Sequence, residues 1–207
     1  MDKTELLYDH YKDTCEIQRE NLILRNKMFV FTTVTMAILL LLSYSPDTCG
    51  AAIIAFIEHA YGIDIAIQFG LIQCLAWVIL IYFSMRYYQA TITIERTYKY
   101  IHKTEGQLNK YVRDSTFIDR EGKSYLLEYP ICSKLMDVMY KWIFPFLYLM
   151  GISVKIYVER RFSFAYVLDV VLFILAFILC VFYMLFNYKI EKSYCNIKTR
   201  KDLNQKQ

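Results

Sequence analysis

The sequence predicts an all-α membrane protein with four transmembrane helices and a cytoplasmic helical stalk. Three observations lead to this fold class. Hydrophobic residues make up 57% of the 207 residues, whereas ordinary soluble domains contain roughly 45–50%. These residues gather in runs that are too long for soluble strands. Two charged segments outside the runs carry the apolar spacing of packed helices.

Four apolar runs approach the roughly 20 residues, within a range of about 17–25, that a helix needs to cross a bilayer. They are Met28 to Ser45, Ile65 to Met85, Met139 to Val158 and Phe164 to Asn187. The first run is predicted to end at Ser45, because Pro46 disfavours helical backbone in the residue before it. The third run is the weakest, since it contains Lys141 and Lys155, and Pro145 is expected to kink it.

A shorter apolar stretch, Gly50 to Gly62, follows the first run. It is too short to span a bilayer. The simplest interpretation is a short helix that lies at the outer membrane surface. A re-entrant segment is the alternative.

The placement of Lys and Arg predicts the orientation in the membrane. The connection from Pro46 to Asp64 contains neither residue, whereas the N-terminal segment, the region from Arg86 to Val138 and the tail after Asn187 are basic. With four spans, the three basic regions fall on one side, which the positive-inside rule assigns to the cytoplasm. The last short loop does not fit this rule, because Lys155, Arg160 and Arg161 would face outward.

The expected organisation follows from these assignments. We expect a multi-pass protein of the bacterial inner membrane with both termini in the cytoplasm. The predicted parts are a cytoplasmic N-terminal helix (1–27), a first transmembrane hairpin with the short outer helix (28–85), a cytoplasmic helix plus a turn region (86–138), a second transmembrane hairpin (139–187) and a basic tail (188–207).

The two cytoplasmic segments before and after the first hairpin carry a helical stripe. The stripe in the second segment alternates steps of 4 and 3 through Tyr87, Thr91, Ile94, Tyr98, Ile101, Glu105, Leu108 and Val112. This is heptad spacing, so the second span is expected to continue as a packed helix. The stripe in the N-terminal segment is Leu7, Thr14, Ile17, Leu24 and Met28. The segments are predicted to pair antiparallel as a stalk. The alternative is that each packs against other copies in an oligomer.

The stalk and the turn after it supply the candidate contacts for a soluble cytoplasmic protein partner. The candidate partner face of the stalk comprises Tyr87, Ile94, Tyr98, Ile101 and Leu108. From Arg113 the periodicity stops, and Gly122 provides the backbone freedom of a tight turn. The candidate partner loop there comprises Arg120, Lys123 and Tyr125.

Polar residues inside the predicted spans are the strongest candidates for function, because burying an ionisable group in a bilayer is costly. Lys155 and Asp169 are equally distant from the turn near Phe162, so they are expected at similar depth on adjacent helices as an ion pair. The pair is interpreted either as a clip between the two helices or as part of a gate or ion pathway. Gln68 and Gln73 are candidates for hydrogen bonds to neighbouring helices or subunits.

Enzymatic signatures are absent from the sequence. It contains no G-x-S-x-G, H-E-x-x-H, Walker-type loop or G-x-G-x-x-G. The six cysteines form no C-x-x-C pair, and the three His leave no zinc spacing. We therefore expect no catalytic residues, no metal site, no cofactor and no enzyme activity. The net charge of +4 is too small to predict nucleic-acid binding.

The layout resembles the small multi-pass membrane proteins of bacterial anti-phage systems, including the accessory membrane proteins of type VI-B CRISPR loci and the SLATT-type effectors. The resemblance is carried by three stretches, which are Tyr11-Lys12 with Arg19 and Arg25, Arg96 to Ile101 with Glu105, and Arg120 to Leu126. It covers the general plan of the chain, and SLATT-type proteins typically have two spans. It implies an oligomeric effector that changes membrane permeability when a cytoplasmic sensor engages it.

Two functional hypotheses follow. The first is such a homo-oligomeric effector or accessory protein in the lipid bilayer. The second is a non-enzymatic anchor or scaffold that recruits a soluble nuclease or signalling enzyme. A small transporter or membrane enzyme is disfavoured by the missing motifs and by the absence of an internal repeat.

Overall fold

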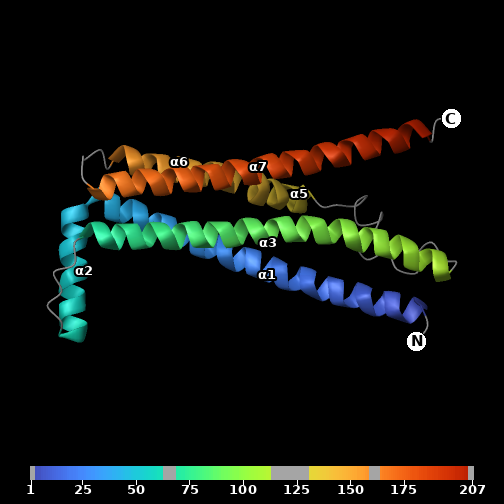
Figure 1. Cartoon of the computed structure of the whole chain (residues 1–207), viewed down its shortest axis with the longest axis horizontal. Coiled ribbons are helices and arrows are strands. Elements are labelled where there is room, and N and C mark those ends of the chain that lie inside the picture. The colour runs from blue at the N-terminus through green and yellow to red at the C-terminus, as the bar shows by residue number, and fades with distance from the viewer. Residues whose placement is uncertain (1–2, 63–68, 113–130, 159–163, 205–207) are drawn as a thin grey trace. The chain divides into compact units, whose positions relative to one another are not determined.

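The computed structural model describes residues 3–62, 69–112, 131–158 and 164–204, and within these ranges the chain is helical and contains no strand (Figure 1). The all-α prediction is therefore confirmed for the described residues. The elements are α1 (Lys3–Tyr44), α2 (Pro46–Tyr61), α3 (Phe69–Val112), α5 (Ile131–Val138), the π-helical turn η1 (Met139–Ile143), α6 (Phe144–Val158) and α7 (Phe164–Asn204).

The chain divides into two compact units. Unit 1 comprises Met1–Val34 and Tyr82–Leu135, and unit 2 comprises Thr35–Ile81 and Met136–Gln207. The long helices α1 and α3 each pass from one unit into the other without a break. The predicted boundaries at residues 27/28 and 85/86 therefore lie within continuous helices, and the boundary at 187/188 lies within α7.

The predicted end of the first apolar run is confirmed, because α1 ends at Tyr44 and α2 begins at Pro46. Proline suits the first position of a helix, since its fixed φ is helical and its missing N–H would have no intrahelical partner there. The far end of α2 is capped by Gly62, whose φ of 64° lies in the left-handed region. Its N–H donates to the carbonyl of Glu58 over 2.8 Å. The short helix expected between the first two runs is thus present.

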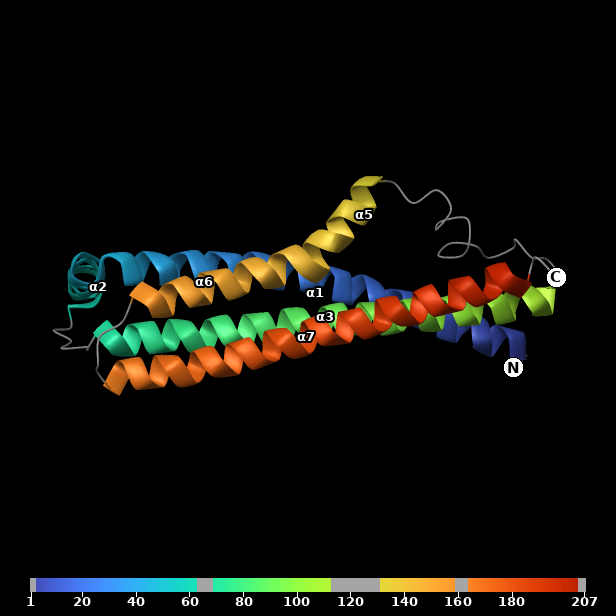
Figure 2. The ribbon, with the colours of Figure 1, turned by 90° about the horizontal axis from the view of Figure 1, so that it is seen from above.

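In unit 1, α1 and α3 pack antiparallel, as the views in Figures 1 and 2 show. We call this pair of segments, residues 3–34 and 82–112, the stalk. Its buried cluster comprises Tyr11, Ile101 and Leu108, with Leu7 and Cys15 packed against it. Nearer the other end of the stalk, the ring of Phe29 lies 6.4 Å from that of Tyr87. The predicted antiparallel pairing of the two segments is therefore what the described residues adopt.

The predicted stripe of α3 corresponds to its buried face. Thr91, Ile94, Ile101, Glu105 and Leu108 are all buried, as is Tyr87, and Tyr98 is half-buried. The heptad spacing works here because the side chains at steps of 3 and 4 face the same neighbouring helix.

The predicted stripe of α1 needs a correction. Ile17 is 50% exposed, whereas Tyr11, Thr14 and Gln18 are buried. The buried face still advances by steps of 3 and 4, but several of its positions hold polar residues. A prediction based on hydrophobicity alone therefore includes Ile17, which lies beside the buried face of α1, and omits Tyr11 and Gln18, which lie on it.

In unit 2, α6 and α7 pack antiparallel, and η1 contacts α7. The helix is irregular next to Pro145, where the sequence predicts a kink, because the π-helical turn η1 ends two residues before this proline. Proline has no N–H to donate to the carbonyl four residues earlier, and its ring crowds that carbonyl. The helix is wider at this turn, since the N–H of Phe144 donates to the carbonyl of Met139, five residues earlier, and not to the carbonyl four residues earlier. Side chains of α7 also bond to carbonyls near this turn, with Tyr183 donating to Tyr140 over 3.3 Å.

Among the described residues, three helical stretches are long and apolar enough to cross a membrane. They are Thr4–Tyr44, Leu135–Val158 and Tyr166–Ile190. They contain the first, third and fourth predicted spans apart from a few terminal residues. The second predicted span begins at Ile65, and its first residues lie outside the described ranges. A helical membrane protein is therefore plausible, whereas four spans are not confirmed.

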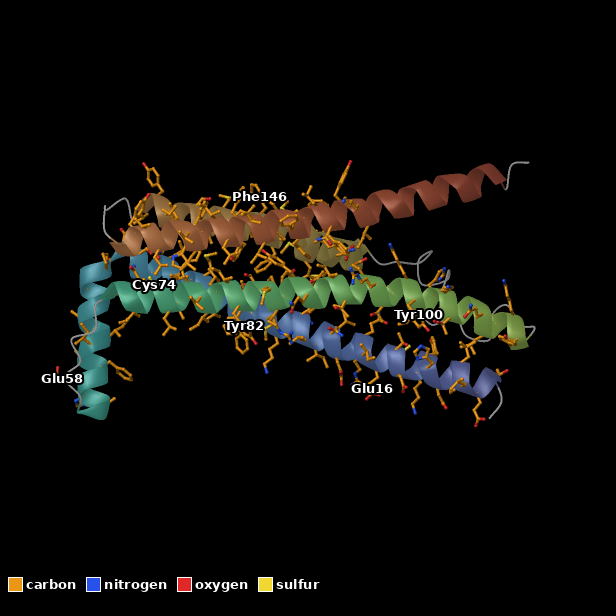
Figure 3. The ribbon with its side chains drawn as sticks, viewed as in Figure 1. Glu16, Glu58, Cys74, Tyr82, Tyr100 and Phe146 are labelled. Carbon is orange, nitrogen blue, oxygen red and sulfur yellow. The ribbon has the colours of Figure 1, made fainter. Side chains whose placement is uncertain are left out.

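The surface of the apolar helices is rich in large hydrophobic side chains. Leu41, Leu75, Phe146 and Phe182 are each more than half exposed, and Phe146 is labelled in Figure 3. An exposed apolar surface of this kind is unusual for a soluble monomer and is typical of a surface that faces lipid or another protein.

Candidate functional site

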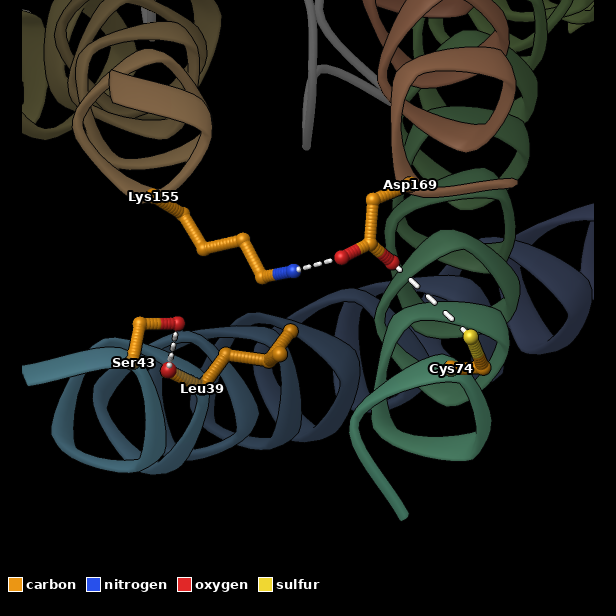
Figure 4. A network of polar contacts seen from close by, with 5 residues as sticks. All are labelled: Leu39, Ser43, Cys74, Lys155 and Asp169. Atoms are coloured by element: carbon orange, nitrogen blue, oxygen red, sulfur yellow. Dashed lines mark hydrogen bonds and ion pairs between the residues drawn. The ribbon is translucent and has the colours of Figure 1, made fainter. Parts of the chain in front are cut away.

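The most unusual feature of unit 2 is a buried ion pair between α6 and α7. Lys155 lies in the last turn of α6 and Asp169 near the start of α7, so the antiparallel packing brings them together. The Nζ atom of Lys155 lies 2.6 Å from Oδ2 of Asp169 (Figure 4). Their side chains are only 1% and 4% exposed. The equal spacing from the turn, seen in the sequence, is thus matched by the contact in the structure.

Two side chains of α3 complete the surroundings of the pair. The thiol of Cys74 donates to the second carboxylate oxygen, Oδ1 of Asp169, with a sulfur–oxygen distance of 3.9 Å. The indole of Trp77, which is fully buried, lies with its ring centroid 5.1 Å from the Nζ atom of Lys155. This is cation–π distance. The pair therefore ties three helices together.

Helix α1 also reaches this region. Figure 4 shows Leu39 and Ser43 close to the ion pair. Leu39 is fully buried, and the hydroxyl of Ser43 donates to the carbonyl of Leu39 over 2.9 Å. Helix α1 thus contributes one apolar and one polar side chain to this region.

The electrostatics of the site follow from this burial. Removing a carboxylate and an ammonium from water costs several kcal/mol each, and their attraction offsets this cost only when they are in close contact with further polar partners. Here the short contact, the thiol and the indole face provide those partners. We call this ion pair a latch, because Lys155 and Asp169 can separate only if water or another polar group takes the place of the lost partner. Within the described residues, no cluster of three or more His, Cys, Asp or Glu side chains is arranged to hold a metal ion.

The predicted intramembrane glutamines are only partly described. Gln73 is buried in unit 2, and Gln68 lies outside the described ranges. A different amide was not foreseen. Asn187 of α7 is 2% exposed, and among the described residues neither its oxygen nor its nitrogen has a hydrogen-bond partner. The sequence does contain a signal for the burial of Asn187, because this residue lies four positions after Tyr183 and therefore on the same buried face of α7.

The predicted stalk residues form the α1–α3 contact. Tyr87, Ile94, Ile101 and Leu108 are buried and Tyr98 is half-buried, so they supply the core of the stalk more than an exposed face. The residues predicted as a partner loop, Arg120, Lys123 and Tyr125, lie outside the described ranges.

The stalk core contains a polar contact that the apolar pattern did not predict. The hydroxyl of Tyr11 donates to Oε1 of Glu105 over 3.0 Å, and Glu105 is buried. Burial, followed by the hydrogen bond to Glu105, raises the pKa of the Tyr11 hydroxyl well above its ordinary value. The pair of residues therefore fixes the register of α1 against α3 while the tyrosine is protonated.

Comparison with protein-family models, curated proteins and solved structures finds no match to this chain. Functional inference therefore rests on the geometry of the two units. The buried ion pair is the feature with the clearest chemical consequence, because ionisable groups within apolar helices are costly and are candidates for function by default.

Proposed function

We propose that the protein is an integral membrane protein with four spans, in which α1 and α3 contribute one transmembrane hairpin and α6 and α7 the other. The exposed apolar side chains of these helices support this arrangement, since lipid is the solvent that suits them. The apolar start of α3 is continuous with the charged part of the stalk. The part of the stalk outside the bilayer (residues 3–27 and 86–112), both termini and the basic tail then face the cytoplasm of a bacterial cell.

The short helix α2 fits a position at the outer membrane surface. In Figures 1 and 2 it runs across the direction of α6 and α7, so it lies along the membrane if those helices cross it. Beyond Gly50 most of its described side chains are exposed, including Phe56 at 70%. A re-entrant segment would need burial in protein or a water-filled cavity. In a variant whose six native cysteines are replaced, a polarity-sensitive dye attached at Phe56→Cys should be quenched by headgroup-level quenchers and not by quenchers at the bilayer centre.

The proposed function is that of an oligomeric, non-enzymatic effector or accessory protein that changes membrane permeability when a cytoplasmic partner or signal engages it. The buried Lys155–Asp169 pair is the observation that carries this proposal. A buried ion pair adds little net stability compared with apolar side chains of similar volume, and its best-attested roles are register and switching. We interpret the pair as the latch of the resting state.

Helices α1 and α3 provide the route from the stalk to the latch. Each is a single unbroken helix, and α3 carries both Tyr87 of the stalk and Trp77 beside the latch. A partner that moves the stalk therefore acts on the helix that covers the ion pair. The resemblance to membrane proteins of anti-phage systems supports bacterial defence as the context of this signal.

The test is a measurement of membrane potential in bacterial cells with inducible expression of the chain, using a potential-sensitive dye with and without the genomic neighbour or phage infection as trigger. The wild type is expected to depolarise the membrane only with the trigger. The Lys155→Met, Asp169→Leu double variant is expected to insert normally and to lose this response. Breaking the partly exposed Lys141–Asp137 pair by Lys141→Met is the matched control. A wild type that never depolarises the membrane contradicts the proposal.

The second candidate function is an anchor or scaffold for a soluble nuclease or signalling enzyme. It is favoured by the closed state of the ion pair, which is covered by Trp77 and Cys74 and leaves its charges little exposed. In that case a soluble partner co-purifies with membranes that contain the chain, the membrane potential stays constant, and the double variant behaves like the wild type.

A further inference from the structure

Three aromatic rings form a patch that joins the two helices of the stalk. The ring of Phe31 on α1 lies 5.2 Å from that of Phe83 on α3, and the ring of Tyr82 lies 5.7 Å from that of Phe83. Phe31 is 38% exposed, and Tyr82, which is labelled in Figure 3, is 53% exposed. These rings, which we call the aromatic patch, therefore offer a continuous apolar surface to the surroundings of the stalk.

Two cations lie beside the aromatic patch, one helical turn from it on the same face of the stalk. Lys27 precedes Phe31 by four residues, and Arg86 follows Phe83 by three. Steps of three and four keep a side chain on one face of a helix. Because α1 and α3 are antiparallel, both steps lead in the same direction, by roughly 6 Å and roughly 4.5 Å at ~1.5 Å per residue. The two cations therefore lie at nearly the same level of the stalk.

Neutral groups hold both cations in place. The Nζ atom of Lys27 lies 5.9 Å from the centroid of the Phe31 ring, which is cation–π distance. The Nη1 atom of Arg86 donates to Oε1 of Gln89 over 3.2 Å. Within the described part of the chain, neither Lys27 nor Arg86 belongs to a salt bridge. Both positive charges are therefore available to an anion that is not part of this stalk.

The predicted spans put the two cations at the level of the lipid headgroups. If the first span begins at Met28 and the second ends at Met85, Lys27 and Arg86 are the first residues outside them. The aromatic patch then lies just inside the hydrocarbon, beside the acyl chains. A zwitterionic headgroup carries its own cation next to its phosphate, which repels Lys27 and Arg86. An anionic headgroup such as that of phosphatidylglycerol carries no cation, so it complements the pair.

We propose that Lys27 and Arg86 bind the phosphate of an anionic phospholipid of the inner leaflet, and that an acyl chain of this lipid packs on the aromatic patch. The inference rests on the proposed four-span topology and adds the class of lipid that the stalk selects. The occupant is a phospholipid and not a soluble phosphate, because the apolar surface adjoins the cations and only a lipid covers both.

The experiment uses the full-length protein in a neutral detergent and phosphatidylglycerol with a fluorescent acyl chain, whose binding is followed by fluorescence polarisation. Unlabelled phosphatidylglycerol should displace this probe from the wild type at a concentration roughly fivefold to twenty-fivefold lower than phosphatidylcholine does, because each cation near a membrane surface contributes about fivefold in affinity for anionic lipid. The Lys27→Gln, Arg86→Gln double variant should lose this preference. The Lys27→Arg, Arg86→Lys double variant should keep it, since both charges remain. Glycerol phosphate, which has no acyl chain, should not displace the probe.

The matched control is the Lys12→Gln, Lys103→Gln double variant, which removes the same charge from exposed positions farther along the stalk. It should keep the wild-type preference. Equal displacement by the two lipids from the wild type overturns the proposal, and so does a preference that survives in Lys27→Gln, Arg86→Gln or is lost in the control. Displacement by glycerol phosphate also overturns it, because a soluble anion would then occupy the site.

The proposed change in membrane permeability is measured separately, by the depolarisation assay in cells. A wild type that shows no lipid preference but depolarises the membrane refutes the lipid site alone. A wild type that prefers phosphatidylglycerol but never depolarises the membrane supports the lipid site and refutes the proposed function.

Discussion

The free energy of the Lys155–Asp169 pair can be measured by removing one partner at a time. Lys155→Met leaves a buried carboxylate beside Cys74, and removing one member of a buried pair typically costs about 3–5 kcal/mol. Asp169→Leu leaves the ammonium over the indole face of Trp77, 5.1 Å from its centroid. A desolvated cation–π contact is worth up to about 2 kcal/mol. We therefore expect Asp169→Leu to cost about 1–2 kcal/mol less than Lys155→Met.

The double variant separates this explanation from simple loss of packing. If the single changes cost about 3–5 and about 1–4 kcal/mol, independent effects would add to about 4–9 kcal/mol. Replacing both charges by apolar side chains removes the desolvation cost as well, so the double variant is expected within about 1 kcal/mol of the wild type or more stable. The two changes should therefore be strongly non-additive.

Unfolding of the four proteins by denaturant in one detergent, followed by far-ultraviolet circular dichroism and tryptophan fluorescence, measures these differences. Lys141→Met is the control, because its ion pair with Asp137 lies within one helical turn and is partly exposed, and it should cost less than about 0.5 kcal/mol. Additive single changes, or single changes no larger than this control, would refute the interpretation of the pair as a buried latch.

The remaining predictions concern the packing of the helices and one titrating group. Gly151→Leu should clearly lower the melting temperature, because a Cβ added at residue 151 would lie 2.9 Å from the sulfur of Met36 and the rest of the leucine side chain would have no room. Gly151→Ala should be tolerated, because the flexible end of the Met36 side chain can shift away from a single added carbon. In the stalk, Leu108→Ala should cost about 2–5 kcal/mol in denaturant unfolding and Ile17→Ala less than about 0.5, since only the former is buried. The raised pKa of the Tyr11 hydroxyl stabilises the stalk below the tyrosine value of the unfolded chain, near 10, and this stabilisation is lost as pH rises above it. The helical signal of the wild type should therefore fall more steeply above about pH 10 than that of Tyr11→Phe, and equal slopes would contradict the assignment.

The elements that depend on local chemistry could be predicted from the sequence. Pro46 set the boundary between α1 and α2, because proline restricts the residue before it and suits the first helical position. The heptad spacing identified the buried face of α3, including Ile101 and Leu108, because helical geometry places those steps on one side. The equal distances of Lys155 and Asp169 from their turn predicted that the two would meet, because the rise of antiparallel helices is regular.

Which polar residues are buried depends on contacts between helices that are distant in the sequence. Nothing in the local sequence distinguishes Tyr11 and Gln18 from exposed polar residues, since their burial depends on the helix that packs against them. The same holds for Cys74 and Trp77, which reach the ion pair from α3, a helix remote from it in sequence. Periodicity reports which face of a helix is buried, whereas the partners of a buried charge are set by contacts between distant segments. That is why the sequence revealed the two charges and the structure revealed what surrounds them.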